Sequence, residues 1–206
     1  MTLRTTAPLL LLLAIVGCSP EVSTTIDSET IDAASSTPLT ETADGQGEQV
    51  TIEFLGELFS LQYQSTEENE IVNEYVPVDE DVEGDWTRML AVREYPALSN
   101  AEEALGNLVR TVGSTYPEAP VEIFTNESTG QSIVEFTLTG NTETSLFVEY
   151  NLFRYEPSPS GSGVVSYQYA VRAYGEDTDA FLSSLTEERG DRLEAISTYD
   201  FPPVVR

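Results

Sequence analysis

The apolar side chains that follow residue 48 alternate with polar ones, and this alternation changes phase at Gly56. Three apolar residues before the glycine stand at even positions and three after it at odd positions (Val50, Ile52 and Phe54; Phe59, Leu61 and Tyr63). Successive side chains of a strand point to opposite faces of its sheet, so a shift of one residue requires a tight turn. The pattern therefore predicts a β-hairpin of residues 49–55 with residues 58–64.

Strand-like and helical patterns continue to the end of the chain. Six more segments have the periodicity of strands, with turn signals between them (71–76, 86–95, 121–125, 131–139, 144–156 and 164–174). Segment 86–95 is apolar on both sides, which favours the interior of a sheet. Together these segments predict an α+β fold, an antiparallel sheet of about six to eight strands covered by two helices.

The two predicted helices differ in their signals. The first begins at a capping box of Ser99 and Glu102, continues with apolar residues at helical spacing and ends at Gly113. The second is expected from residue 178 to residue 196. Its apolar residues are predicted to lie on one side (Phe181, Leu182, Leu185, Leu193 and Ile196).

The first 18 residues have the pattern of a secretory signal. A basic residue, Arg4, precedes an apolar run, and Ile15-Val16-Gly17-Cys18 resembles a bacterial lipobox. We expect residues 1–17 to be a lipoprotein signal peptide and Cys18 to carry a covalent lipid that anchors the chain to a membrane. Residues 18–48 are rich in small and acidic residues and predict a disordered acidic tether. Residues 49–206 then form a single α+β domain.

Several classes of chemistry are excluded by composition. The chain has no histidine, all nine of its basic residues are arginine, and Cys18 is its only cysteine. Ser-His-Asp and Cys-His catalysis, histidine-ligated zinc, Schiff-base chemistry and the P-loop lysine are therefore absent. A hydrolase that uses paired carboxylates, as glycosidases do, remains an alternative. Otherwise we expect a protein without catalytic residues.

The chain is strongly acidic, with a formal net charge of −27. This charge opposes nucleic-acid binding, which depends on neutralising phosphates with Lys and Arg. It is compatible with recruitment of cations or of a basic partner, but the interpretation we favour is solubility or adaptation to a saline habitat. Four arginines fall within predicted strands, where we expect ion pairs with neighbouring carboxylates (Arg88, Arg93, Arg154 and Arg172).

The densest acidic cluster lies between residues 79 and 85. Its carboxylates could supply oxygen ligands to calcium (Asp79, Asp81, Glu83 and Asp85). The spacing starts like an EF-hand, but Leu90 stands where the bidentate glutamate belongs, so an EF-hand is rejected. The two readings left open are a looser calcium site and a solvated hairpin tip.

Aromatic residues offer a second candidate site. Trp86, Tyr167 and Tyr169 could bind a partner, because aromatic side chains dominate interface hot spots. The alternative is that they belong to the core, with the tyrosines in cross-strand pairs.

Short blocks of sequence resemble known families. The blocks 73–77, 86–87 and 92–96 look like a set of uncharacterised bacterial envelope proteins. The hairpin Leu55-Gly56-Glu57-Leu58-Phe59-Ser60-Leu61, with the order of elements that follows it, looks like the Mog1/PsbP/DcrB-like group over roughly residues 50–201. The resemblance implies an antiparallel sheet between helices and a partner-binding or assembly role, and it carries over no functional residue.

From these observations we expect a non-enzymatic binding or assembly module, anchored by its lipid in the bacterial cell envelope. An envelope protein is the expected partner. Because Ser19 replaces the aspartate that retains lipoproteins at the inner membrane, the outer membrane is the expected destination in a Gram-negative source. The alternatives are a calcium-dependent binding module that uses the acidic loop 79–85 and a carboxylate-based hydrolase.

Overall fold

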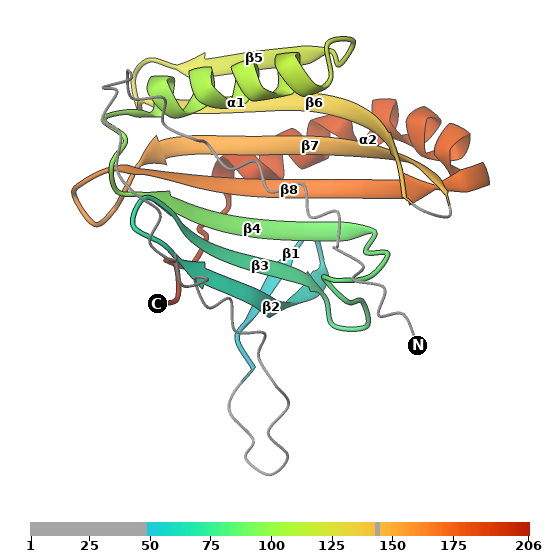
Figure 1. Ribbon diagram of the computed structural model, residues 1–206, viewed down its shortest axis with the longest axis horizontal. Coiled ribbons are helices and arrows are strands. Elements are labelled where there is room, and N and C mark those ends of the chain that lie inside the picture. Colours follow the sequence, from blue (N-terminus) through green and yellow to red (C-terminus); the bar gives the residue numbers. More distant parts are fainter. Residues whose placement is uncertain (1–48, 143–144) are drawn as a thin grey trace, which may run out of the picture.

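The computed structural model describes residues 49–142 and 145–206 (Figure 1). The predicted signal peptide over 1–17, the lipidated Cys18 and the tether over 18–48 lie outside these residues and stay predictions. Within the described residues no helix is long and apolar enough to cross a membrane.

Eight strands form one antiparallel sheet, and two α-helices pack against it. In chain order the elements are β1 (Thr51–Phe54), β2 (Glu57–Thr66), β3 (Ile71–Pro77), β4 (Arg88–Tyr95), α1 (Ala101–Thr115), β5 (Val121–Asn126), β6 (Gln131–Asn141), β7 (Leu146–Pro157), β8 (Val164–Tyr174), the 3₁₀ turn η1 (Gly175–Asp177) and α2 (Thr178–Thr198). The α+β class, the antiparallel sheet and the two helices are thereby confirmed.

The order of strands across the sheet is β1-β2-β3-β4-β8-β7-β6-β5. Within each half of the chain every strand pairs with its neighbour in sequence, and the two halves meet where β4 pairs with β8. The connection through α1 carries the chain to the far side of the sheet, so β1 and β5 become the two edge strands (Figure 1). The predicted interior position of segment 86–95 is confirmed, although the strand itself begins at Arg88.

The predicted hairpin at Gly56 is confirmed. Leu55 and Gly56 both have positive φ angles, 52° and 78°, and Phe54 pairs with Glu57. Positive φ at both central residues is the conformation that lets a two-residue loop match the twist of its strands. This turn accounts for the phase shift of the apolar residues.

The capping box of α1 lies one residue later than the sequence indicates. Asn100 caps the helix, because its Oδ1 accepts a hydrogen bond from the backbone N of Glu103 at 2.9 Å. Glu103 in turn accepts from the backbone N of Ser99 at 3.0 Å, so the box of Ser99 with Glu102 is wrong. Gly113 does not end the helix, which continues to Thr115.

The two helices cover opposite faces of the sheet (Figure 1). On the α1 face, α1 packs on β6, β7 and β8, and its buried residues are Ala101, Ala104, Leu108 and Val112. On the α2 face, α2 packs on β7 and β8, and the C-terminal Phe201 joins the same core. Burial of these apolar surfaces is the main stabilising contribution.

The apolar side of α2 differs from the predicted one at Leu182, which is 44% exposed. Phe181, Leu185, Leu193 and Ile196 do pack against the core. Arg192 is buried there as well. The buried side of α2 therefore includes the charged Arg192 and leaves out Leu182.

A chain of hydrogen-bonded polar side chains crosses the α1 face. Arg172 donates to Glu149, Asn151 joins Glu149 to Gln168, and Arg93 joins Gln168 to Glu74. Each of the four strand arginines forms an ion pair with a glutamate, as predicted (Arg88 with Glu57 and Glu80, Arg93 with Glu74, Arg154 with Glu156, and Arg172 with Glu149). Pairing offsets the cost of removing these charges from water.

Substituting two glycines of the β7–β8 turn should separate strain from steric overlap. Gly161 and Gly163 both have positive φ, 90° and 84°. A Cβ on Gly161 would meet no atom within 4 Å, whereas one on Gly163 would lie 2.8 Å from Pro96 Cα and closer still to Tyr95 O. We expect Gly161→Ala to lower the free energy of unfolding by about 1 kcal/mol and Gly163→Ala by about 3 kcal/mol or more, measured by urea denaturation. Equal losses would contradict the close backbone contact.

Candidate binding site between the edge strand and the second helix

The acidic residues predicted to hold calcium do not converge. Within the described residues, which include this whole loop, no three Asp or Glu side chains are grouped to hold a metal ion. Asp81 instead accepts a hydrogen bond from the backbone N of Glu83 at 2.9 Å. The carboxylate that organises the loop is Glu80, which accepts from the backbone N of Thr87 at 2.6 Å and pairs with Arg88. Sequence reasoning passed over Glu80.

The three aromatic residues predicted to bind a partner are buried. Trp86 is 7% exposed, and its ring lies 3.8 Å from the guanidinium carbon of Arg172. Tyr167 stacks on Phe201 with ring centroids 4.7 Å apart, and Tyr169 lies 5.1 Å from Phe54. The structure thus places all three in the core, where each is at most 7% exposed.

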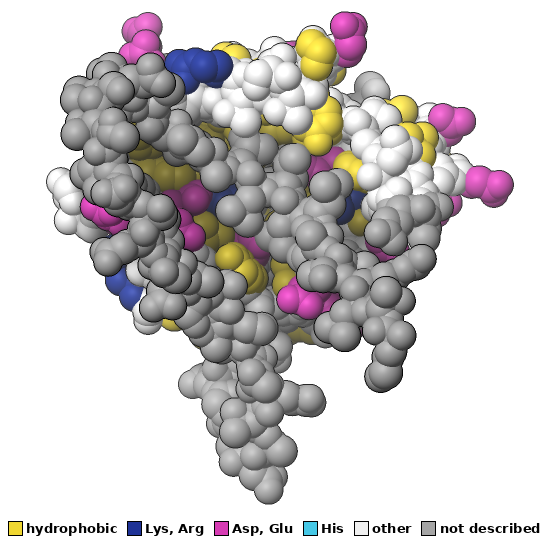
Figure 2. Space-filling view, in the orientation of Figure 1, with side chains coloured by type: hydrophobic (Ala, Val, Ile, Leu, Met, Phe, Trp, Pro, Cys, Tyr) yellow, Lys and Arg dark blue, Asp and Glu magenta, His cyan; other side chains and the backbone are white. Residues whose placement is uncertain are grey.

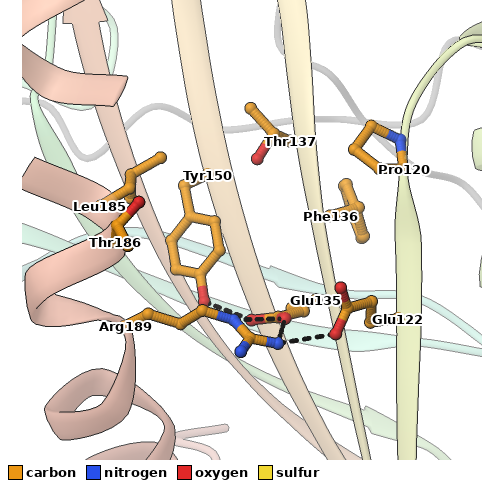
Figure 3. Close-up of a pocket in the computed structure, with 9 residues that line it drawn as sticks. All are labelled: Pro120, Glu122, Glu135, Phe136, Thr137, Tyr150, Leu185, Thr186 and Arg189. Carbon is orange, nitrogen blue, oxygen red and sulfur yellow. Dashed lines mark hydrogen bonds and ion pairs between the residues drawn. The ribbon is translucent and has the colours of Figure 1, made fainter. Parts of the chain in front are cut away.

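A small pocket of about 180 Å³ lies on the α2 face, between the helix and the outer strands. It forms where α2, which packs on β7 and β8, no longer covers the sheet (Figure 3). The residues that line it come from β5 and the residue before it, from β6, from β7 and from α2 (Pro120, Glu122, Glu135, Phe136, Thr137, Tyr150, Leu185, Thr186 and Arg189).

Polar contacts at one side of this pocket connect β5, β6, β7 and α2 (Figure 3). Tyr150 donates its phenol hydrogen to Glu135 Oε2 at 2.5 Å. Arg189 Nε donates to Glu135 Oε1 at 2.7 Å, and Arg189 Nη2 donates to Glu122 Oε2 at 2.7 Å. Burial and the adjacent Glu135 raise the pKa of the Tyr150 phenol well above its usual value, so it remains a neutral donor.

Strand register explains why two carboxylates meet here. Glu122 and Glu135 are direct partners across β5 and β6, where like charges repel. Arg189 of α2 bridges them and removes that repulsion. The two glutamates differ in exposure: the Glu135 residue is buried, while the Glu122 side chain is 62% exposed. Among the described residues Glu122 Oε1 has no hydrogen-bond donor.

The sequence held one signal for this cluster. The turn Ser128-Thr129-Gly130 predicts the β5–β6 hairpin, and its register sets Glu122 opposite Glu135. The contribution of Arg189 could not be predicted in this way. It lies 54 residues beyond Glu135, and the sequence does not fix which side of its helix faces the sheet.

Glu122 and Glu135 are the pair of carboxylates to test against the requirements of a carboxylate-based hydrolase. A carboxylate hydrolase needs one acid that donates a proton to the leaving group. Here both glutamates are ion-paired with the same arginine, an arrangement that supports the local packing of α2 on the sheet. The cluster therefore gives no support to that alternative.

Next to the pocket, β5 is an open edge. It pairs with β6 on one side, and no described strand pairs with it on the other. Every residue of the strand after Val121 is exposed, including Ile123 (46%) and Phe124 (42%), which point to opposite faces. The strand contains no lysine, proline or bulge of the kind that protects edges, and Glu122 is its one charged residue.

Two comparisons with known proteins complete the description. A protein-family model matches residues 47–201, a span that contains every strand and both helices described above. No curated protein matches the sequence.

The burial of Tyr169 makes stability depend on alkaline pH. Burial raises the pKa of its phenol to about 12, above the usual value of about 10. Between these values the unfolded chain loses the proton first, so the free energy of unfolding falls as pH rises, by up to about 2.7 kcal/mol. We expect Tyr169→Phe to move the midpoint of alkaline unfolding, followed by circular dichroism, to higher pH.

Stability at pH 7 is the reference for this comparison, because both the folded and the unfolded chain keep the proton there. Tyr95 and Tyr167, whose pKa values burial likewise raises to about 12, remain in the variant, so the transition should shift rather than disappear. An unchanged midpoint would count against the buried state of Tyr169.

Proposed function

The chain belongs to the family whose model matches residues 47–201, and we propose that it is a non-enzymatic binding or assembly module. In this proposal an extended segment of a partner adds to the sheet along β5. The observation that carries it is the open edge of β5, exposed over five of its six residues and bearing Ile123 and Phe124.

An edge strand presents a row of backbone N–H and C=O groups that another strand can satisfy. The other edge of the sheet is less suited to this. β1 has four residues, and its apolar side chains Ile52 and Phe54 are buried in the core. β5 is longer, and both of its faces offer exposed apolar surface to the side chains of an added strand.

The size of the neighbouring pocket favours a peptide over a small molecule. Pockets for drug-sized ligands enclose roughly 300–1,000 Å³. The cavity beside β5 measures about 180 Å³, which suits a single side chain. Every second side chain of a strand added to β5 would lie on the face that holds this cavity, and one of them would enter it.

We also propose that the fold is of the Mog1/PsbP/DcrB type. The opening hairpin at Gly56, the helix after the fourth strand and the closing helix support this, as does the placement of the two helices on opposite faces. The cellular setting of the proposal is the bacterial envelope. There a lipid on Cys18 would anchor the protein, to the outer membrane in a Gram-negative cell, with residues 18–48 as tether.

The anchor is tested by Cys18→Ser in the cells that make the protein. We expect the wild-type chain in the membrane fraction, labelled by a palmitate analogue, because two or more acyl chains hold a protein stably at a bilayer. The variant should lose the label and leave the membrane fraction. Retention of the variant at the membrane would contradict lipid anchoring through Cys18.

The binding role is tested by a photoreactive amino acid placed at Ile123. In intact cells this position should crosslink repeatedly to the same envelope protein, since it lies on the proposed docking edge. The matched position is Leu58, which is equally exposed but lies on β2, away from this edge. A further change, Phe124→Lys, should abolish the crosslink from position 123 by blocking strand addition. Equal crosslinking from 123 and 58 would refute the assignment of β5.

A further inference from the structure

We propose that the segment bound along β5 is basic, with lysine or arginine at alternate positions on the α2 face and apolar residues between them. This inference rests on the proposed strand addition and names the chemistry of the partner. It follows from the two faces of β5, the charges around it and the pocket beside it.

The two faces of β5 differ in character. Glu122 and Phe124 lie on the α2 face, since their strand partners are Glu135 and Ile133 of that face. Val121 and Ile123 lie on the α1 face. In an added strand, residues opposite Glu122 and Phe124 would share the α2 face. A carboxylate and an aromatic ring both attract a cation, whereas Ile123 favours an apolar neighbour.

The charges near β5 favour a basic partner. Glu118 and Glu127 are exposed just before and just after the strand, and Glu122 is exposed within it. In the space-filling view acidic side chains project at the end of the molecule that holds α1 and β5, with a basic side chain among them (Figure 2). The net charge of −27 would also speed the encounter with a basic segment.

The pocket has the features that a long basic side chain requires. Pro120 and Leu185 provide apolar contact for its aliphatic stem. Glu122 and Glu135 carry two negative charges against the single positive charge of Arg189 (Figure 3). Both oxygens of Glu135 already accept hydrogen bonds, so Glu122 Oε1 is the acceptor left for an incoming cation.

The test uses the purified full chain and three labelled peptides of ten residues, made of Val-Arg, Val-Gln or Val-Glu repeats. Affinity is measured by fluorescence anisotropy at physiological ionic strength. We expect the Val-Arg peptide to bind about tenfold more tightly than the Val-Gln peptide, as one charged hydrogen bond provides. The Val-Glu peptide should not bind.

Two variants separate the site from the general acidity of the chain. Glu122→Gln should weaken binding of the Val-Arg peptide about tenfold and leave binding of the Val-Gln peptide unchanged. Glu53→Gln is the matched control, because it removes an exposed carboxylate from the opposite edge strand, β1. Equal losses in the two variants would mean that only the overall charge attracts the peptide, and would overturn the inference. Both variants should melt within a few degrees of the wild-type chain, since both side chains are exposed.

Hydrogen exchange distinguishes failure of this inference from failure of the proposed function. Bound Val-Arg peptide should newly protect those backbone amides of residues 121–126 that point away from β6, and leave the amides of residues 51–54 unchanged. Equal protection and affinity with the Val-Gln peptide would keep strand addition and overturn the basic partner. Protection of these outward-pointing amides without peptide, together with a dimer in sedimentation, would identify a second copy of the chain as the occupant and overturn the basic partner too. Absence of protection at β5 with every peptide would overturn the proposed function as well.

Discussion

The pairing of β4 with β8 is the contact on which the rest of the architecture depends. Every other pair of neighbouring strands is also adjacent in the chain, but this pair joins residues 69 to 83 positions apart, from Tyr95 opposite Val164 to Arg88 opposite Val171. Once these strands lie side by side, α1 must cross the sheet and β5 must take the outer position. The open edge, the pocket beside it and the proposed binding role are therefore consequences of one long-range pairing.

Charge is arranged differently inside and outside this sheet. Inside, arginines are paired with glutamates: Arg93 with Glu74 and Arg172 with Glu149. Unpaired, such buried charges would be strongly destabilising. Outside, acidic residues far exceed basic ones, because the chain has 36 acidic residues and nine arginines. The cluster at Arg189 lies at the boundary between the interior and the surface, because its guanidinium pairs with both the buried Glu135 and the exposed Glu122.

Local patterns in the sequence predicted much of the fold and little of the site. The hairpin at Gly56, strand β8 and the start of α2 were found because alternation, turn residues and helical spacing are short-range signals. The cap of α1 was misplaced by one residue because Ser99 and Asn100 are both good caps, each followed three residues later by a glutamate. Leu182 was assigned to the core because the rotation of α2 is set by its packing on β7 and β8.

The candidate site was missed for a related reason. The sequence predicted a calcium site in the acidic run 79–85 and a partner-binding site at Trp86, Tyr167 and Tyr169. The structure places these three aromatic residues in the core. The pocket instead depends on Arg189 meeting a hairpin that precedes it by more than fifty residues. Sequence patterns with a fixed residue spacing do not predict a contact between residues so far apart in the chain.

The stacking of Trp86 on Arg172 has a spectroscopic consequence. Trp86 is the only tryptophan of the chain, so the tryptophan emission of the whole protein arises at one place, where the loop before β4 meets β8. That place lies on the α1 face, away from the pocket at α2. Emission that changed when β5 was occupied would therefore report a rearrangement carried across the sheet, and constant emission would show that the surroundings of Trp86 stay as they are.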